Sequence, residues 1–457
     1  MKKLHIVLFL LVCVFIFFGW KTIDPDFGWR IRVGQLILNQ GIPHTDPFSF
    51  TMMNYPFIDF SWLTHICIFL IYGLTNNSLL LSLIFGFIAV LSLYEAIFVE
   101  KKKDGWFVPA LAFLIGSSLF GVIGIRPQIW GWLLFMFWVN ELRKGSKASF
   151  SILCLMQLIW VNIHGSFFLG VGTFILYIIS EYIQKKEIKK HIGKLVVLFC
   201  ITMINPYGWR LWREIVIGLS DSQLHLRNQE WISSIFVLNI SFWFYCTFFF
   251  SLFIRNWKHT SLFEKFLSLF FFSISLSTVR NMPLFVLVSA PLCVQMWFRF
   301  ENSVTKEMKK YFFLFKNTLI ILFFFIGFAR IGNGIAQIKP INKVYPVDAV
   351  SFLIGHKAQG RIYSEYEWGG YLIWKMPALK VFIDGRMMGW MLKQNDPKQS
   401  DNTTKEYFII KDKHPSFEPY RRKYNITYAL IRKDKEKNIF IKYKKIYEDE
   451  LSIVYKL

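Results

Sequence analysis

Apolar runs long enough to cross a membrane dominate this chain of 457 residues. A helix needs about 20 apolar residues to span the hydrocarbon of a bilayer, and shorter helices are tolerated inside a bundle. Hydrophobic residues make up 54% of the sequence and charged residues only 18%, which is too little polar surface for a water-soluble enzyme of this size. We therefore expect a mainly α, polytopic transmembrane helix bundle of about 11 spans. The expected spans are 4–20, 61–98, 105–124, 127–142, 148–163, 166–183, 192–204, 235–254, 261–279, 283–298 and 311–329.

Basic residues gather in short clusters between these runs and produce the formal net charge of +23. Such clusters are typical of cytoplasmic loops, so the charge indicates topology and gives no reason to expect a nucleic-acid partner. If the chain starts in the cytoplasm, all of these clusters lie on the cytoplasmic side of the cell membrane. The expected partner of the protein is then the lipid bilayer. The clusters are Lys101–Lys103, Arg143 with Lys144, Lys185 and Lys186 with Lys189 and Lys190, Arg255 with Lys258, and Lys306 with Lys309 and Lys310.

The run 61–98 complicates this topology, because it is long enough for two crossings around Asn76 and Asn77. Two full crossings would move Lys101–Lys103 to the outside and invert everything that follows. We therefore count one net crossing here, with room for a re-entrant or interfacial piece.

The domain organisation follows from a change in run length. Residues 1–330 form the expected transmembrane domain, with an outer loop at 21–60 and an interfacial segment at 205–232 that mixes Trp and Arg with apolar residues. Past residue 330 the pattern favours a small extracytoplasmic α/β domain at 331–457. Its expected strands are 361–363, 380–384, 426–431 and 453–455, and its expected helices are 347–357 and 416–424.

Several kinds of chemistry have no motif in this sequence. The six cysteines each lie in an apolar run without paired spacing, which predicts buried thiols and neither disulfides nor a metal site. P-loop, dinucleotide-binding and zinc-binding spacings are absent, as is the Gly-x-Ser-x-Gly motif of hydrolases. Chemistry driven by nucleotide hydrolysis is therefore not expected.

Acidic residues concentrate in the first outer loop. Asp24 and Asp26 stand one residue apart at the end of a span, where carboxylates are costly unless they bind a cation or activate a nucleophile. The alternative is that they cap the interfacial helix expected at 27–39. His44 and Asp46 follow as candidate substrate-binding residues, although Asp46 before Pro47 also fits a turn.

Two arginines, Arg126 and Arg280, each lie between two apolar spans on the expected outer side. A guanidinium at headgroup level is suited to a lipid-borne phosphate, because its fixed donors pair with phosphate oxygens in a two-pronged way. The alternative is an anchor to ordinary phospholipid headgroups.

Other polar or aromatic residues fall at the same predicted face. Asn162 and His164 occupy one outer turn, Asn205 belongs to a turn motif, and Glu230 precedes the span at 235–254. In the C-terminal domain, four further residues suit contact with a sugar, with a packed core containing an Asp–Arg pair as the alternative. These are Trp368, Tyr371, Asp384 and Arg386.

The order of these motifs resembles the type-C (GT-C) glycosyltransferase superfamily, which consists of multi-span enzymes with an acidic first outer loop. More narrowly, the chain is similar to a group of bacterial membrane proteins with an Asp-x-Asp-Phe-aromatic opening. The matching stretches are 24–27, 41–51, 162–165, 205–208, 368–372 and 382–386. The sequence departs from the expected paired aromatics and histidine after Asp26, since it has Gly28, Trp29 and Arg30 there.

The resemblance implies transfer of a sugar from a polyprenyl-phosphate-linked donor to an envelope glycan, lipid or protein acceptor. Asp24 or Asp26 would be the general base or the ligand of a divalent cation, and Arg126 and Arg280 would stabilise the departing phosphate. Direct displacement would invert the anomeric centre. A lipid-linked glycan transporter or flippase, and a catalytically silent envelope-assembly protein, are the alternative functions.

Overall fold

The computed structural model describes residues 2–97, 105–220, 231–390, 403–435 and 438–457. The chain divides into two compact units, each assembled from three separate segments. Unit 1 comprises Met1–Trp20, Ser78–Gly208 and His225–Ile338, and unit 2 comprises Lys21–Asn77, Trp209–Leu224 and Lys339–Leu457.

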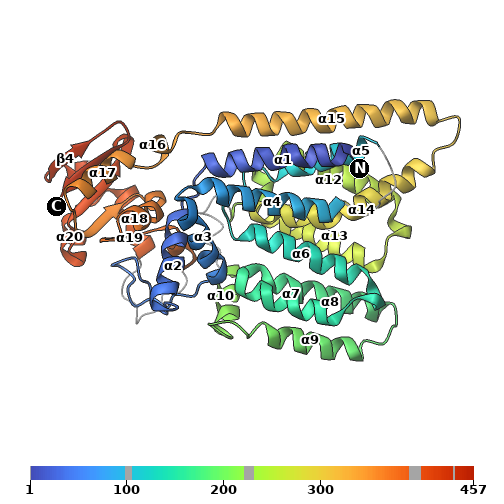
Figure 1. Ribbon diagram of the computed structural model, residues 1–457, viewed down its shortest axis with the longest axis horizontal. Coiled ribbons are helices and arrows are strands. Elements are labelled where there is room, and N and C mark those ends of the chain that lie inside the picture. The colour runs from blue at the N-terminus through green and yellow to red at the C-terminus, as the bar shows by residue number, and fades with distance from the viewer. Residues whose placement is uncertain (1, 98–104, 221–230, 391–402, 436–437) are drawn as a thin grey trace. The chain divides into compact units, whose positions relative to one another are not determined.

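Unit 1 is a bundle of apolar helices (Figure 1). Its α-helices are α1 (Lys2–Lys21), α4 (Ser78–Ile97), α5 (Phe107–Ser118), α6 (Gln128–Arg143), α7 (Phe150–Ile163), α8 (Phe168–Ile183), α9 (Lys189–Ile201), α12 (Ile240–Arg255), α13 (Leu262–Ser277), α14 (Met282–Asn302) and α15 (Lys309–Ala336). Buried aromatic side chains join helices that are distant in sequence, as in the stacking of Phe107 on Trp297 with ring centroids 3.9 Å apart. Within the described residues, five helices are long and apolar enough to cross a membrane, and others are shorter apolar helices. The chain is thus a mainly helical membrane protein, while the count of about 11 spans stays a prediction.

The run 61–98 is broken into two helices, α3 (Trp62–Thr75) and α4. The break falls at Asn76, whose φ of 50° is a left-handed conformation that asparagine tolerates better than most residues. The two helices belong to different units, α3 to unit 2 and α4 to unit 1. The expectation for the cysteines is partly wrong: Cys246 and Cys293 are buried, whereas Cys13, Cys67 and Cys200 are exposed.

Unit 2 contains a five-stranded mixed sheet (Figure 1). Its strands are β1 (Gly360–Ser364), β2 (Leu379–Val381), β3 (Tyr428–Arg432), β4 (Lys444–Glu448) and β5 (Ser452–Lys456), in the order β2-β1-β3-β5-β4. Strand β1 pairs in parallel with β2 and β3, and β5 pairs antiparallel with β3 and β4. The expected C-terminal α/β fold is therefore confirmed.

Helices cover both faces of this sheet. The face of Ile362 and Leu430 packs with residues from α17 (Val347–Gly355) and α18 (Gly369–Lys375). The face of Tyr363 and Ala429 packs with residues from α19 (Thr403–Lys413) and α20 (Glu418–Tyr424). This alternation of neighbouring residues between faces is the period of a strand. In the described residues, unit 2 also contains the α-helices α2 (Phe27–Gln40), α3, α10 (Arg210–Leu219) and α16 (Ile341–Val344).

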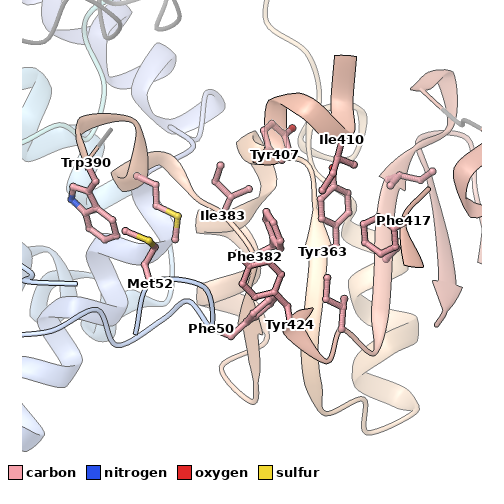
Figure 2. Packing of buried hydrophobic residues seen from close by; sticks show 14 of the residues in the cluster. Phe50, Met52, Tyr363, Phe382, Ile383, Trp390, Tyr407, Ile410, Phe417 and Tyr424 are labelled. Atoms are coloured by element: carbon pink, nitrogen blue, oxygen red, sulfur yellow. The ribbon is translucent and has the colours of Figure 1, made fainter. Parts of the chain in front are cut away.

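The first loop shares its core with this C-terminal sheet. Residues 48–50 run parallel to the edge strand β2, with Phe50 N–H donating to Val381 O at 3.2 Å and Val381 N–H to Phe48 O at 3.2 Å. Figure 2 shows Phe50 and Met52 in one cluster with residues of the C-terminal segment such as Phe382. The loop thus covers an edge that would otherwise offer unpaired backbone groups.

Candidate active site

The acidic pair of the first loop is held by an arginine one helical turn later. Asp26 occupies the N-cap position of α2 but makes no side-chain cap bond. Arg30 instead reaches back from the first turns of α2, with Nη1 at 3.2 Å from Asp24 Oδ1 and Nη2 at 3.2 Å from Asp26 Oδ2. Asp24 Oδ1 also accepts the backbone N–H of Asp26 at 2.9 Å. The capping alternative is therefore wrong for the Asp26 side chain.

The two acids differ in their exposure to solvent. The Asp24 side chain is 8% exposed and that of Arg30 11%, whereas Asp26 is 33% exposed. A guanidinium stays protonated at any physiological pH, so the three groups together carry a net charge of −1 when both acids are ionised. Asp26 is the member of this acid–arginine site, Asp24–Asp26–Arg30, that a reactant could reach.

The residues of this site do not fit a divalent cation. Such ions take six or more oxygen ligands in proteins and solvent, and a dedicated protein site supplies several of them. Across the described part of the chain, no group of three or more His, Cys, Asp or Glu side chains is placed to hold a metal ion. Asp24 and Asp26 already share the positive charge of Arg30.

Three linked side chains, of which two are buried, orient Asp26. The indole N–H of Trp29 donates to Asp26 Oδ1 at 2.9 Å, and its ring meets that of His65 edge-on with centroids 5.0 Å apart. His65 Nδ1 lies 2.7 Å from Asp59 Oδ2, and both side chains are almost fully buried. The paired Asp59 and His65 thus hold the Trp29 ring in the position from which its indole N–H donates to Asp26.

Glycines of the C-terminal segment lie directly against the acidic loop. A Cβ placed on Gly385 would lie 2.1 Å from Asp26 Oδ1, and one on Gly370 would lie 2.1 Å from the carbonyl oxygen of Pro25. Any larger residue at Gly385 must displace the carboxylate, so the close approach depends on the absent side chain. Two motifs that stand over 340 positions apart in the sequence therefore meet within unit 2.

A second acid–arginine cluster lies in the core of unit 2. Arg386 donates from Nη1 to Asp46 Oδ1 at 2.7 Å, from Nε to Asp384 Oδ1 at 2.7 Å and from Nη2 to Asp384 Oδ2 at 2.5 Å. Asp46 also accepts the backbone N–H of Ser49 at 3.1 Å. The three side chains are at most 3% exposed. Burial lowers the pKa of Arg386, but the charges of Asp384 and Asp46 outweigh it and raise the pKa above its usual value.

The other candidates of unit 2 have less access. Trp368 is fully buried and donates its indole N–H to Val344 O at 2.9 Å. Tyr371 is 5% exposed, and burial, followed by the charge of Asp348, raises its pKa to about 12. These positions favour core packing over stacking on a sugar. His44 is exposed, and its carbonyl accepts the N–H of Phe57 at 3.0 Å.

The remaining candidates belong to unit 1, where Arg126 and Arg280 immediately precede helices. Arg126 is half-buried beside Pro127, the N-cap of α6, and its backbone N–H donates to Gly124 O at 3.0 Å. Arg280 is half-buried in the 3₁₀ turn before α14, with its guanidinium 5.5 Å from the ring centroid of Trp231. Helix N-termini carry partial positive charge, which adds to that of each arginine.

The polar residues at the other turns of unit 1 make hydrogen bonds within the fold. His164 Nδ1 accepts the N–H of Ser166 at 3.1 Å and so caps a 3₁₀ turn. Asn162 Nδ2 donates to Ile204 O at 3.0 Å, and Asn205 Oδ1 accepts the N–H of Tyr207 at 2.8 Å in an Asx turn. Glu230 lies outside the described residues.

Comparisons with known proteins identify the fold. A scan against protein-family models and a search of curated proteins found no match. Among solved structures, the chain is similar to the apo oligosaccharyltransferase of Archaeoglobus fulgidus, with a TM-score of 0.65 and 13% identity. The match covers 94% of this chain and 69% of the archaeal one. The chain therefore shares the fold of this oligosaccharyltransferase.

Proposed function

We propose that this protein is a GT-C-type membrane glycosyltransferase. It moves a sugar from a polyprenyl-phosphate-linked donor to a glycan, lipid or protein acceptor of the cell envelope, at the outer face of the membrane. The fold likeness to an oligosaccharyltransferase supports the reaction class. The observation that carries the proposal is the half-exposed Asp26 carboxylate, oriented by Trp29 and Arg30.

In this proposal Asp26 is the general base. The acceptor hydroxyl attacks the anomeric carbon of the donor and passes its proton to the Asp26 carboxylate as the new glycosidic bond forms. The bond between the sugar and the phosphate breaks in the same step, so the anomeric configuration inverts and polyprenyl phosphate leaves. Asp24 is a positioning residue, because it accepts the Asp26 N–H and shares Arg30.

The leaving phosphate gains charge as its bond to the sugar breaks. We assign its stabilisation to Arg126 and Arg280, since a guanidinium supplies fixed paired donors to phosphate oxygens. Their positions just before α6 and α14 support this assignment, because the helix N-termini favour an anion there.

The test is sugar transfer by the purified full-length protein in lipid nanodiscs. A polyprenyl-phosphate sugar is supplied with an extract of envelope glycans and lipids, and release of polyprenyl phosphate is followed. We expect Arg126→Gln and Arg280→Gln each to lower kcat/KM for the donor by about tenfold to a hundredfold. Arg255→Gln is the matched control, since this exposed arginine belongs to the opposite predicted face.

Two outcomes would contradict the proposal. One is the absence of sugar release with every polyprenyl-phosphate donor offered. The other is an equal fall in kcat/KM for Arg255→Gln and Arg280→Gln, which would contradict the assignment of Arg280 to the donor phosphate. Movement of an intact lipid-linked glycan across the bilayer without sugar release would support a flippase instead.

A further inference from the structure

The acid–arginine site contains its own cation. The guanidinium of Arg30 bridges both acids, with one Nη atom 3.2 Å from Asp24 and the other 3.2 Å from Asp26. Carboxylates placed one residue apart in the chain repel each other when ionised, so a positive charge between them stabilises the pair. In this protein that charge comes from a side chain.

The sequence and its local fold account for the position of Arg30. It stands four residues after Asp26, and residues at this spacing on a helix lie on the same face. The backbone N–H of Arg30 donates to Asp26 O at 3.2 Å, and the neighbouring indole of Trp29 flanks the guanidinium at 5.6 Å from its ring centroid. The first turn of α2 thus fixes the positions of both Asp26 and the Arg30 guanidinium.

Burial and two ion pairs give the charge of Arg30 a well-defined position. The side chain is 11% exposed, and the acid that it contacts at Asp24 is 8% exposed. Arginine cannot lose its proton at physiological pH. A divalent cation placed between the same oxygens would meet this fixed positive charge at close range, and it would gain only two carboxylate side chains as ligands.

We propose that Arg30 is the resident cation of the acid pair and takes the place of a divalent metal ion between Asp24 and Asp26. The wild-type protein then has no tight metal site at these acids. Removal of Arg30 takes away this positive charge and leaves two adjacent carboxylates, so the affinity of this position for a divalent cation rises above that of wild type. The proposal rests on the proposed function only in placing the acid pair at the reacting centre.

The test is Mn²⁺ binding to the full-length protein in nanodiscs, measured without substrate from the electron paramagnetic resonance signal of free Mn²⁺. We expect wild type and Asp24→Asn to bind Mn²⁺ equally weakly. Arg30→Gln binds one Mn²⁺ at least tenfold more tightly, and Asp24→Asn added to Arg30→Gln abolishes the gain. Arg30→Lys keeps a positive charge and serves as the matched control, with wild-type behaviour expected.

Two results would overturn the proposal. The first is a stoichiometric Mn²⁺ site in wild type that Asp24→Asn removes, a comparison that holds even if Arg30→Gln does not fold. The second is a folded Arg30→Gln variant, judged by its thermal midpoint, that binds Mn²⁺ no more tightly than wild type. Failure of sugar transfer would contradict the proposed function and leave these binding results unaffected.

Discussion

Two clusters in unit 2 have the same composition, two aspartates and one arginine, yet they differ in exposure. Asp46, Asp384 and Arg386 are at most 3% exposed and saturated with short hydrogen bonds. In the acid–arginine site, Asp26 is 33% exposed and its contacts with Arg30 are longer, at 3.2 Å. The first cluster can stabilise the fold, whereas the second has an acid that a substrate can reach.

The difference shows that charge composition alone does not identify a reacting site. A buried carboxylate needs a full set of partners to offset its lost hydration, and a fully bonded acid has no position left for a substrate proton. The buried cluster has a different role. It ties the loop at Asp46 to the segment of Gly385, and that glycine is the neighbour of Asp26.

The largest effect is expected from Arg386→Ala, which leaves two buried carboxylates without their cation. Loss of one partner from a buried ion pair costs about 3–5 kcal/mol, so unit 2 should lose much of its free energy of unfolding. Thermal unfolding followed by tryptophan fluorescence measures this change. Arg422→Ala is the control, because the 76% exposed Arg422 pairs with Glu418 at the surface. Equal effects of the two substitutions would erase the distinction between buried and exposed clusters.

A middle effect is expected from Gly385→Ala. The added methyl group would lie 2.1 Å from Asp26 Oδ1, and the flexible carboxylate is the group that must move. Misplacement of a reacting group by about 1 Å costs about 100-fold in rate, so transfer should fall by that order at a nearly unchanged thermal midpoint. Gly355→Ala is the matched control, because no atom lies within 4 Å of the added group. A wild-type rate of sugar transfer by Gly385→Ala would contradict the placement of Asp26 at the reacting centre.

The smallest effect is expected at a third cluster, where Glu418 binds Arg421 and Arg422 near the surface. Hydrogen bonds from Arg421, Arg422 and Tyr443 hold the pKa of Glu418 well below its usual value. A folded pKa below the unfolded one adds stability above the unfolded pKa, and this stability is lost as the pH falls towards the folded pKa. Glu418→Gln should therefore lower the thermal midpoint at pH 7 by less than about 2 °C, and the difference should vanish in acid. A drop as large as that of Arg386→Ala would contradict the ranking by burial.

Local patterns predict much of this fold. A helix was expected at 27–39 and is found as α2 (Phe27–Gln40), and another was expected at 127–142 and is found as α6 (Gln128–Arg143). Their interfacial and membrane-spanning positions stay predictions. Apolar periodicity is a local property, so a short window of sequence is enough to find such elements. Strand β4 (Lys444–Glu448) was not predicted, because it is a polar edge strand with largely exposed side chains and no apolar run.

The long-range part of the fold could not be read from the sequence. The pairing of residues 48–50 with β2 joins segments more than 300 positions apart, and no local pattern encodes it. The expected domain boundary after residue 330 stays a prediction, and the compact unit that contains the C-terminal sheet also contains Lys21–Asn77.

The candidate site could be predicted only in part, because local patterns reveal some of its residues and tertiary contacts bring in the others. Asp24 and Asp26 stand out by their position at the end of a span, but Arg30 was missed. Its spacing of four residues from Asp26 on an expected helix could have identified the ion pair. Gly385 and the bond between Arg386 and Asp46 depend on tertiary contacts, so only the structure reveals them.

The most direct test is a paired measurement on Asp26→Asn: the initial rate of sugar release from a polyprenyl-phosphate donor and the thermal midpoint of the same preparation. Asp412→Asn, an exposed aspartate of α19, is the matched control. We expect the rate of Asp26→Asn to fall by at least about 100-fold, as for loss of a general base, while its midpoint stays close to that of the control. A rate equal to that of Asp412→Asn, or a loss of rate explained by a matching loss of fold, would contradict the assignment of Asp26 as the base.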